Sequence, residues 1–306
     1  MSGKKKRKAS LRCLFLLSLV GVLLLGAGIV RAAAHKPGFG KEKGSYYYWN
    51  ENGKRLKGLQ KIGENTFWFD KKGVQRTGWR KIGGSYYFFR IENGAEGYII
   101  TNAVINDVKL GKDGRAKLTG HTRRKLKMMT RCAQIADKLV KADQSKRTKL
   151  KAVFRYVMNL TRSNTGNFRT GSEWDLYYAE YILDRKRGDC FCQGALMAYM
   201  ANAVGYSHAK AVSSGGHGWA KIDGEYYDPN WANVIGFDKC FGATSGQSGT
   251  GGRPRWSKNE KYVADLGATD EKASVRKSKI AALETKYVRK KIRRLKKIKA
   301  MSAVLQ

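Results

Sequence analysis

The sequence predicts an α+β protein that begins with a module of β-hairpins, and three observations predict it. Aromatic residues and glycines recur every twenty residues between about positions 43 and 119, which is typical of stacked hairpins. Apolar residues then follow a helical period from about His121 to Asp184. After residue 188, a short apolar helix precedes two strand-like runs, which indicates a helix packed on an antiparallel sheet.

The repeat is carried by two columns of aromatic residues. The columns are Tyr47, Phe67 and Tyr87 in one and Tyr48, Trp68 and Phe88 in the other. Each unit is predicted to contain an aromatic strand, a turn such as Glu51-Asn52-Gly53, and a second short strand. Because a lone hairpin is barely stable in water, the units are expected to bury one another's aromatic faces.

The run from Thr77-Gly78-Trp79 to Tyr86-Tyr87-Phe88 resembles the cell-wall-binding repeats of Gram-positive surface proteins, of the choline-binding and glucan-binding type. That resemblance implies shallow aromatic sites for choline on teichoic acid, or for glucan. Aromatic faces suit both ligands, through cation–π attraction or stacking on a sugar ring. The rings assigned to such sites are Tyr47, Tyr48, Trp68, Phe69, Trp79, Tyr87 and Phe88. In the alternative interpretation these rings only pack the hairpins together.

The helical segment is predicted to contain two helices separated at residues 142–145, followed by a third around 174–183. Cys132 lies on an apolar stripe of the first helix, so it is expected to be a buried structural thiol. Asp189 is expected to cap a further helix whose first turn contains Cys190. The positive end of that helix favours a reactive thiolate, although a buried structural cysteine is the alternative.

Two strand-like runs surround a predicted hairpin turn at residues 223–224. With this turn, Ile222 faces Glu225. His217 and Asp228 then project from the same face of the hairpin as diagonal neighbours. The register therefore predicts a His–Asp pair.

Several motifs together resemble the transglutaminase-like superfamily, the papain-like Cys–His–Asp enzymes, over about residues 125–235. The motifs are Gly188-Asp189-Cys190, Gly205, His217-Gly218-Trp219 and Tyr227-Asp228-Pro229. The resemblance implies a papain-like fold in which the nucleophile helix packs on an antiparallel sheet. It also implies that Cys190 attacks an amide carbonyl of a peptide or protein, that His217 transfers the proton, and that Asp228 orients the imidazole.

Two other residues compete for these roles, Cys192 for that of the nucleophile and His208 for that of the base. Cys192 lies in a Cys-Gln-Gly sequence that also occurs in the superfamily, but only Cys190 fits the Gly-Asp-Cys junction and the step to Gly205. His208 has no acidic partner at hairpin spacing. No cofactor is expected. No metal site is expected either, because the Cys-x-Cys pair lacks a second pair and the histidines are scattered.

The termini and the net charge of +37 indicate an exported protein with polyanionic partners. Residues 1–34 combine a basic leader, an apolar run and an Ala-x-Ala site, as in a signal peptide or a short membrane anchor. A basic amphipathic helix is predicted at the C-terminus and is expected to contact anionic wall polymer or lipid, with nucleic acid a less favoured partner. The predicted divisions are 1–34, the wall-binding module 43–119, the catalytic domain 120–260 and the basic tail 261–306.

Overall fold

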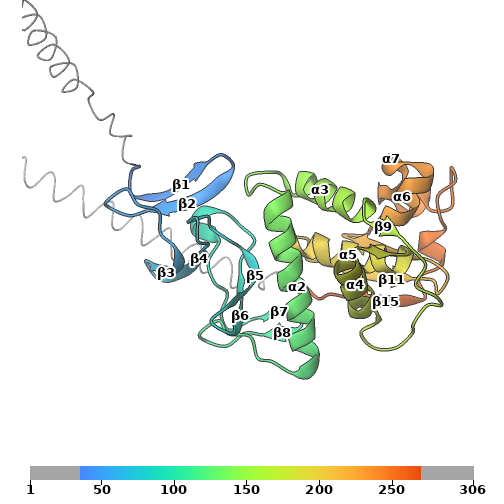
Figure 1. Cartoon of the computed structure of the whole chain (residues 1–306), viewed down its shortest axis with the longest axis horizontal. Coiled ribbons are helices and arrows are strands. Elements are labelled where there is room, and N and C mark those ends of the chain that lie inside the picture. The colour runs from blue at the N-terminus through green and yellow to red at the C-terminus, as the bar shows by residue number, and fades with distance from the viewer. Residues whose placement is uncertain (1–34, 270–306) are drawn as a thin grey trace, which may run out of the picture. The chain divides into compact units, whose positions relative to one another are not determined.

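The structure is a computed structural model that describes residues 35–269 (Figure 1). The predicted signal peptide or anchor and most of the predicted basic tail lie outside the described residues. Within residues 35–269, no helix is both long enough and apolar enough to cross a membrane.

Within residues 35–269, the structure divides into a small unit, residues 35–38 and 49–54, and a large unit, residues 39–48 and 55–269, and each is described by itself. In the small unit, His35 stacks on Trp49 with ring centroids 4.4 Å apart. The side-chain oxygen of Asn50 accepts hydrogen bonds from the backbone amides of Asn52 and Lys54. These bonds close the tight turn that the Asn52-Gly53 pair predicted.

Two-stranded sheets make up the first part of the structure. They are β1 (Gly38–Glu42) with β2 (Ser45–Trp49), β3 (Gly58–Ile62) with β4 (Asn65–Phe69), β5 (Gly78–Ile82) with β6 (Ser85–Phe89), and β7 (Val104–Ile105) with β8 (Val108–Lys109). Gly58 pairs with Phe69 and Gly78 pairs with Phe89, so consecutive hairpins share one register twenty residues apart. The predicted repeat is confirmed. A further hairpin, β1 with β2, begins at Gly38, before the predicted start at residue 43.

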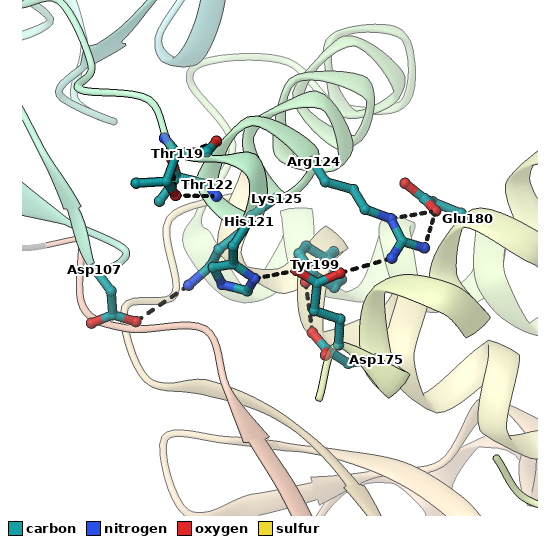
Figure 2. Close-up of polar contacts among 10 residues, drawn as sticks. Asp107, Thr119, His121, Thr122, Arg124, Lys125, Asp175, Glu180 and Tyr199 are labelled. Atoms are coloured by element: carbon teal, nitrogen blue, oxygen red, sulfur yellow. Dashed lines mark hydrogen bonds and ion pairs between the residues drawn. The ribbon is translucent and has the colours of Figure 1, made fainter. Parts of the chain in front are cut away.

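The helices follow in the predicted order. They are α2 (Gly120–Leu139), α3 (Lys146–Met158), α4 (Trp174–Arg185) and α5 (Cys190–Ala203). Thr119 caps α2 through a reciprocal pair of bonds with Thr122, which satisfies two donors at the helix start (Figure 2). Polar contacts tie these helices together. Arg124 of α2 donates to Glu180 of α4, and the Tyr199 hydroxyl of α5 donates to Asp175 of α4 at 2.6 Å.

One antiparallel sheet of five strands follows α5, in the order β14-β13-β12-β11-β15. The strands are β11 (Ala209–Ser213), β12 (Gly218–Ile222), β13 (Glu225–Tyr227), β14 (Phe241–Ala243) and β15 (Tyr262–Asp265). α5 packs on β11 and β12, which buries its apolar residues from Phe191 to Ala201. The protein therefore has the mixed helix-and-sheet architecture that the sequence predicted.

The remaining elements are short. They are β9 (Thr161–Arg162), β10 (Arg187–Gly188), α6 (Pro229–Ile235) and α7 (Phe237–Cys240), with 3-10 turns at Gly94–Glu96, Ser245–Gln247 and Trp256–Lys258. The predicted domain boundary after residue 260 falls just before the last strand of this sheet. β15 pairs with β11 from Lys210 to Ser213, so the sheet continues to Asp265.

Candidate active site

The start of α5 presents Cys190 as its first residue, partly exposed. One carboxylate oxygen of Asp189 accepts a hydrogen bond from the backbone amide of Cys192 at 3.1 Å, so the predicted N-cap is confirmed. The other oxygen accepts bonds from the backbone amide and the hydroxyl of Thr165. Asp189 therefore fixes the helix start and the preceding loop in one position.

Two glycines allow the backbones of α5 and β12 to touch. A Cβ atom on Gly194 would lie 2.5 Å from the backbone nitrogen of Trp219. A Cβ atom on Gly218 would lie 2.8 Å from the Cα of Phe191 and 3.0 Å from the carbonyl oxygen of Cys190. Because both positions lack a side chain, the strand that begins one residue after His217 lies directly against the first turn of α5.

The hairpin of β12 and β13 has the predicted register, with Ile222 opposite Glu225. It brings His217 and Asp228 together, since the Nε2 atom of His217 lies 2.6 Å from Oδ2 of Asp228. Asp228 is completely buried. Its carboxylate also accepts hydrogen bonds from the indole Nε1 of Trp256 at 2.9 Å and from the backbone amide of Trp231 at 3.0 Å.

The charge of His217 follows from these neighbours. Burial acts to lower the pKa of His217, but the carboxylate of Asp228 and the hydrogen bond with Cys190 outweigh it and raise that pKa to about 10. Since Nε2 faces Asp228, the other ring nitrogen, Nδ1, is the one left for Cys190. The site therefore holds His217 as an imidazolium between the Asp228 carboxylate and Cys190 at neutral pH.

The other cysteines are unsuited to act as nucleophiles. Cys192 is completely buried, and burial together with the nearby Asp189 carboxylate raises the pKa of its thiol strongly. Cys132 is buried on α2 as expected, and burial raises the pKa of its thiol to about 12. Cys240 is also buried, with its pKa raised to about 12. His208, the rival base, is exposed.

Sequence reasoning missed two features of this site. Trp256 lies just after a stretch rich in glycine and serine, residues 242–252, and no sequence signal marked its contact with Asp228. Gln193 is completely buried; its Nε2 donates to the carbonyl of Val157 at 3.1 Å, and its Oε1 accepts from Asn230 at 2.8 Å. The only sequence signal for these buried hydrogen bonds was that Asn230 lies two residues after Asp228.

The aromatic rings assigned to wall ligands fall into two groups. Phe69, Trp79 and Phe88 are at most 2% exposed and pack in the core, where they offer no face to a ligand. Their burial agrees with the packing alternative. The other two buried rings, Tyr47 and Tyr87, also contact basic side chains. The guanidinium of Arg55 lies 3.9 Å from the centroid of the Tyr47 ring, and the Tyr87 hydroxyl accepts a hydrogen bond from Arg115.

Tyr48 and Trp68 are the assigned rings that remain partly exposed. Phe39 packs edge-on against Tyr48 with ring centroids 5.0 Å apart. Within residues 35–269, no group of three or more His, Cys, Asp or Glu side chains is placed to hold a metal ion.

Comparison with known proteins identifies the hairpin module. Residues 56–97 match the choline-binding repeat family, which supports cell-wall binding by this part of the chain. The comparison with curated proteins gave no match.

Solved structures similar to this chain cover a limited part of it. CbpJ from Streptococcus pneumoniae TIGR4 is 23% identical over 27% of this chain and 28% of that chain, with a TM-score of 0.24. The choline binding domain of Spr1274 in Streptococcus pneumoniae is 20% identical over 28% of this chain and 99% of that chain, with a TM-score of 0.25. The modular Cpl-1 endolysin, complexed with a peptidoglycan analogue, is 24% identical over 21% of this chain and 18% of that chain, with a TM-score of 0.19.

Proposed function

We propose that this chain is a cell-wall-bound cysteine enzyme of transglutaminase-like type, which acts on amide bonds of a peptide or protein through Cys190, His217 and Asp228. The observation that carries the proposal is the position of His217, whose Nε2 lies 2.6 Å from Oδ2 of the buried Asp228 and whose pKa is raised in part by its interaction with Cys190 at the start of α5. A thiolate, an imidazole and a carboxylate in this order are the parts of a nucleophilic triad.

The reaction follows from the order of these three groups in the site. The Cys190 thiolate attacks the carbonyl carbon of the amide, and the oxyanion that forms is stabilised by the backbone N–H of Cys190 at the start of α5. The His217 imidazolium donates its proton to the leaving amine, which breaks the C–N bond and leaves a thioester on Cys190. Water or a second amine then attacks the thioester, while His217 accepts its proton. Asp228 keeps the imidazole oriented throughout.

The choline-binding repeats give the enzyme its location. Choline on teichoic acid is the wall ligand that the family match favours, and the partly exposed Tyr48 is the ring in the module best placed to contact a quaternary ammonium. Holding the enzyme on the wall raises the local concentration of wall peptides around Cys190. An exported, surface-associated location is consistent with this arrangement.

Mass spectrometry of wall peptides and proteins incubated with the full chain tests the proposal. The wild type is expected to generate cleaved amides or new amide links, and Cys190→Ala is expected to generate neither. Cys192→Ala is the matched control, because Cys192 is buried two residues further along the same helix. Equal product from wild type and Cys190→Ala would leave a wall adhesin with a catalytically silent domain as the function, which the repeat match by itself favours.

A further inference from the structure

Arg162 lies beside the start of α5, on the segment that joins α3 to α4. Its strand, β9, runs parallel to β10, and Arg162 is paired with Gly188, two residues before Cys190. Three residues further on, Thr165 donates hydrogen bonds to the carboxylate of Asp189 from its backbone amide and its hydroxyl. The backbone around Arg162 is therefore fixed to the residues that lead into Cys190.

The guanidinium of Arg162 is directed towards α6. Its Nη2 donates to Oδ1 of Asn230 at 3.4 Å, and the buried Asn230 donates in turn to Gln193 at 2.8 Å. This second bond fixes the amide of Asn230 so that its oxygen faces the arginine. The next residue, Trp231, is partly exposed and lies edge-on to His217 with ring centroids 6.3 Å apart. Arg162 is thus held next to the residue that borders His217.

The charge of Arg162 is not neutralised within the described part of the chain. Its side chain makes the single hydrogen bond described above and no ion pair, so most of its N–H donors are left for another partner. The two carboxylates beside the catalytic pair, Asp189 and Asp228, already accept hydrogen bonds from other groups of the protein. Neither of them is therefore free to pair with Arg162.

The three segments that border the site contain no acidic residue. They are residues 159–172, 213–218 and 229–237, and their only Lys or Arg residues are Arg162 and Arg169. A rim with this charge attracts an anionic substrate and repels a cationic one. An arginine adds selectivity to this attraction, because its planar guanidinium matches a carboxylate through two parallel hydrogen bonds.

We propose that Arg162 is a specificity-determining residue, which binds a carboxylate of the substrate beside the amide that Cys190 attacks. The substrate is accordingly an acidic peptide, with a carboxylate on the residue next to the reacting amide. This inference rests on the proposed function, and it deepens that function by naming the class of substrate. Asn230 positions the guanidinium, and Gln193 in turn positions Asn230.

Labelling of the full chain with two matched thiol probes tests the inference. The probes are the bromoacetyl derivatives of glutamate α-amide and glutamine α-amide, which differ only in a side-chain carboxylate or carboxamide. Mass spectrometry measures the rate of alkylation at Cys190 by each probe. The wild type is expected to react about fivefold faster with the glutamate probe, because Arg162 pairs with its carboxylate. Arg162→Gln should reduce this preference to about twofold or less, the part due to the general positive charge. Arg162→Lys should give an intermediate preference, since lysine keeps the charge but loses the planar fork.

Arg169→Gln is the matched control, because it removes the same charge from the same segment. The guanidinium of Arg169 lies 4.6 Å from the centroid of the Tyr177 ring on α4, so this variant should keep the preference of the wild type. A purely structural role of Arg162 would change both rates by the same factor, and the ratio of the rates would then stay constant.

Two kinds of failure are distinguishable. Equal rates of the wild type with both probes, a preference that Arg162→Gln retains, or an equal loss in Arg169→Gln would each overturn the carboxylate site. These outcomes would leave Cys190 as a nucleophile. A Cys190 that reacts with neither probe in the folded protein, but reacts in the unfolded chain, would contradict the proposed function, and the role of Arg162 would be overturned with it.

Discussion

Asp228 raises the pKa of His217, and Trp256 in turn stabilises the Asp228 carboxylate through a hydrogen bond. A carboxylate with no exposed surface is stable only where donors compensate for lost water, and here an imidazole, an indole N–H and a backbone N–H do so. The Trp256 ring also stacks on Tyr226 with centroids 5.7 Å apart. The indole therefore combines packing with a hydrogen bond to the carboxylate that contacts His217.

Trp256→Phe is expected to separate these two contributions. Phenylalanine keeps an aromatic ring against Tyr226 but removes the donor to Asp228, so the free energy of unfolding should fall by about 1.5–3 kcal/mol. Haloacetamide labelling of Cys190 should slow, because the carboxylate that holds His217 becomes less well fixed. Urea unfolding and labelling followed by mass spectrometry measure the two effects. Unchanged labelling would show that Trp256 acts only in packing.

The raised pKa of His217 makes stability depend on pH in a defined direction. The folded state binds the His217 proton with a pKa of about 10, against 6.5 for the ordinary side chain. The contribution is therefore complete below pH 6.5 and is lost as the pH rises towards 10, because only the unfolded state releases the proton in this window. Stability should decline with rising pH above 6.5.

Urea unfolding at several pH values measures this decline. His217→Gln is the control and should show a flatter profile, since glutamine does not titrate. The comparison is clearest below about pH 7.5, where thiols in the unfolded chain are still largely protonated. Parallel profiles for wild type and His217→Gln would contradict the raised pKa.

At the scale of the elements, local patterns predicted more than long-range contacts. The aromatic period identified the hairpins, the Asp223-Gly224 turn set the register that pairs His217 with Asp228, and Asp189 marked the start of α5. Each of these signals spans a few residues, and so can be read from the sequence. The roles of Trp68 and Phe88 could not be separated, because burial depends on what packs over each hairpin.

Contacts between distant segments escaped prediction for a physical reason. β15 joins the sheet beside β11 some fifty residues after it, and Trp256 reaches Asp228 from a loop whose composition is typical of solvent exposure. Neither contact is marked in the sequence by a repeating apolar pattern or by turn residues. The basic composition beyond residue 260 also hid a four-residue strand, which placed the predicted domain boundary inside the sheet.

Gly194→Ala tests the contact between α5 and β12. Alanine normally stabilises a helix interior by about 1 kcal/mol relative to glycine. Here its Cβ would lie 2.5 Å from the backbone of Trp219, and a rigid strand cannot move away as a flexible side chain would. The clash is expected to outweigh the higher helix propensity of alanine, so the free energy of unfolding should fall by about 1–3 kcal/mol. Labelling of Cys190 should slow as His217 moves away.

Gly120→Ala is the matched control. It is the first residue of α2, and an added Cβ meets no atom within 4 Å. The same substitution should therefore leave stability unchanged or slightly raised in urea unfolding. A Gly194→Ala protein as stable as Gly120→Ala would show that the two backbones are not held in contact.

At the scale of the whole molecule, two kinds of binding interaction are expected between the protein and the cell wall. A net charge of +37 attracts any polyanion, and this attraction weakens as salt screens it. Under the proposed function, the repeats bind choline through aromatic contact with a quaternary ammonium, which is short-ranged and responds less to salt. Binding to the wall should therefore have a salt-sensitive part and a choline-sensitive part.

Elution from purified choline-containing walls distinguishes the two parts. Choline chloride should release more of the full chain than sodium chloride at the same ionic strength, because it competes for the repeats as well as screening charge. Tyr48→Ala should narrow this difference, since Tyr48 is the partly exposed ring that we assign to choline. Cys190→Ala should elute like the wild type, because attachment does not use the thiol. Equal release by both salts would mean that charge alone holds the protein on the wall, and the choline assignment of the repeats would then be wrong for this chain.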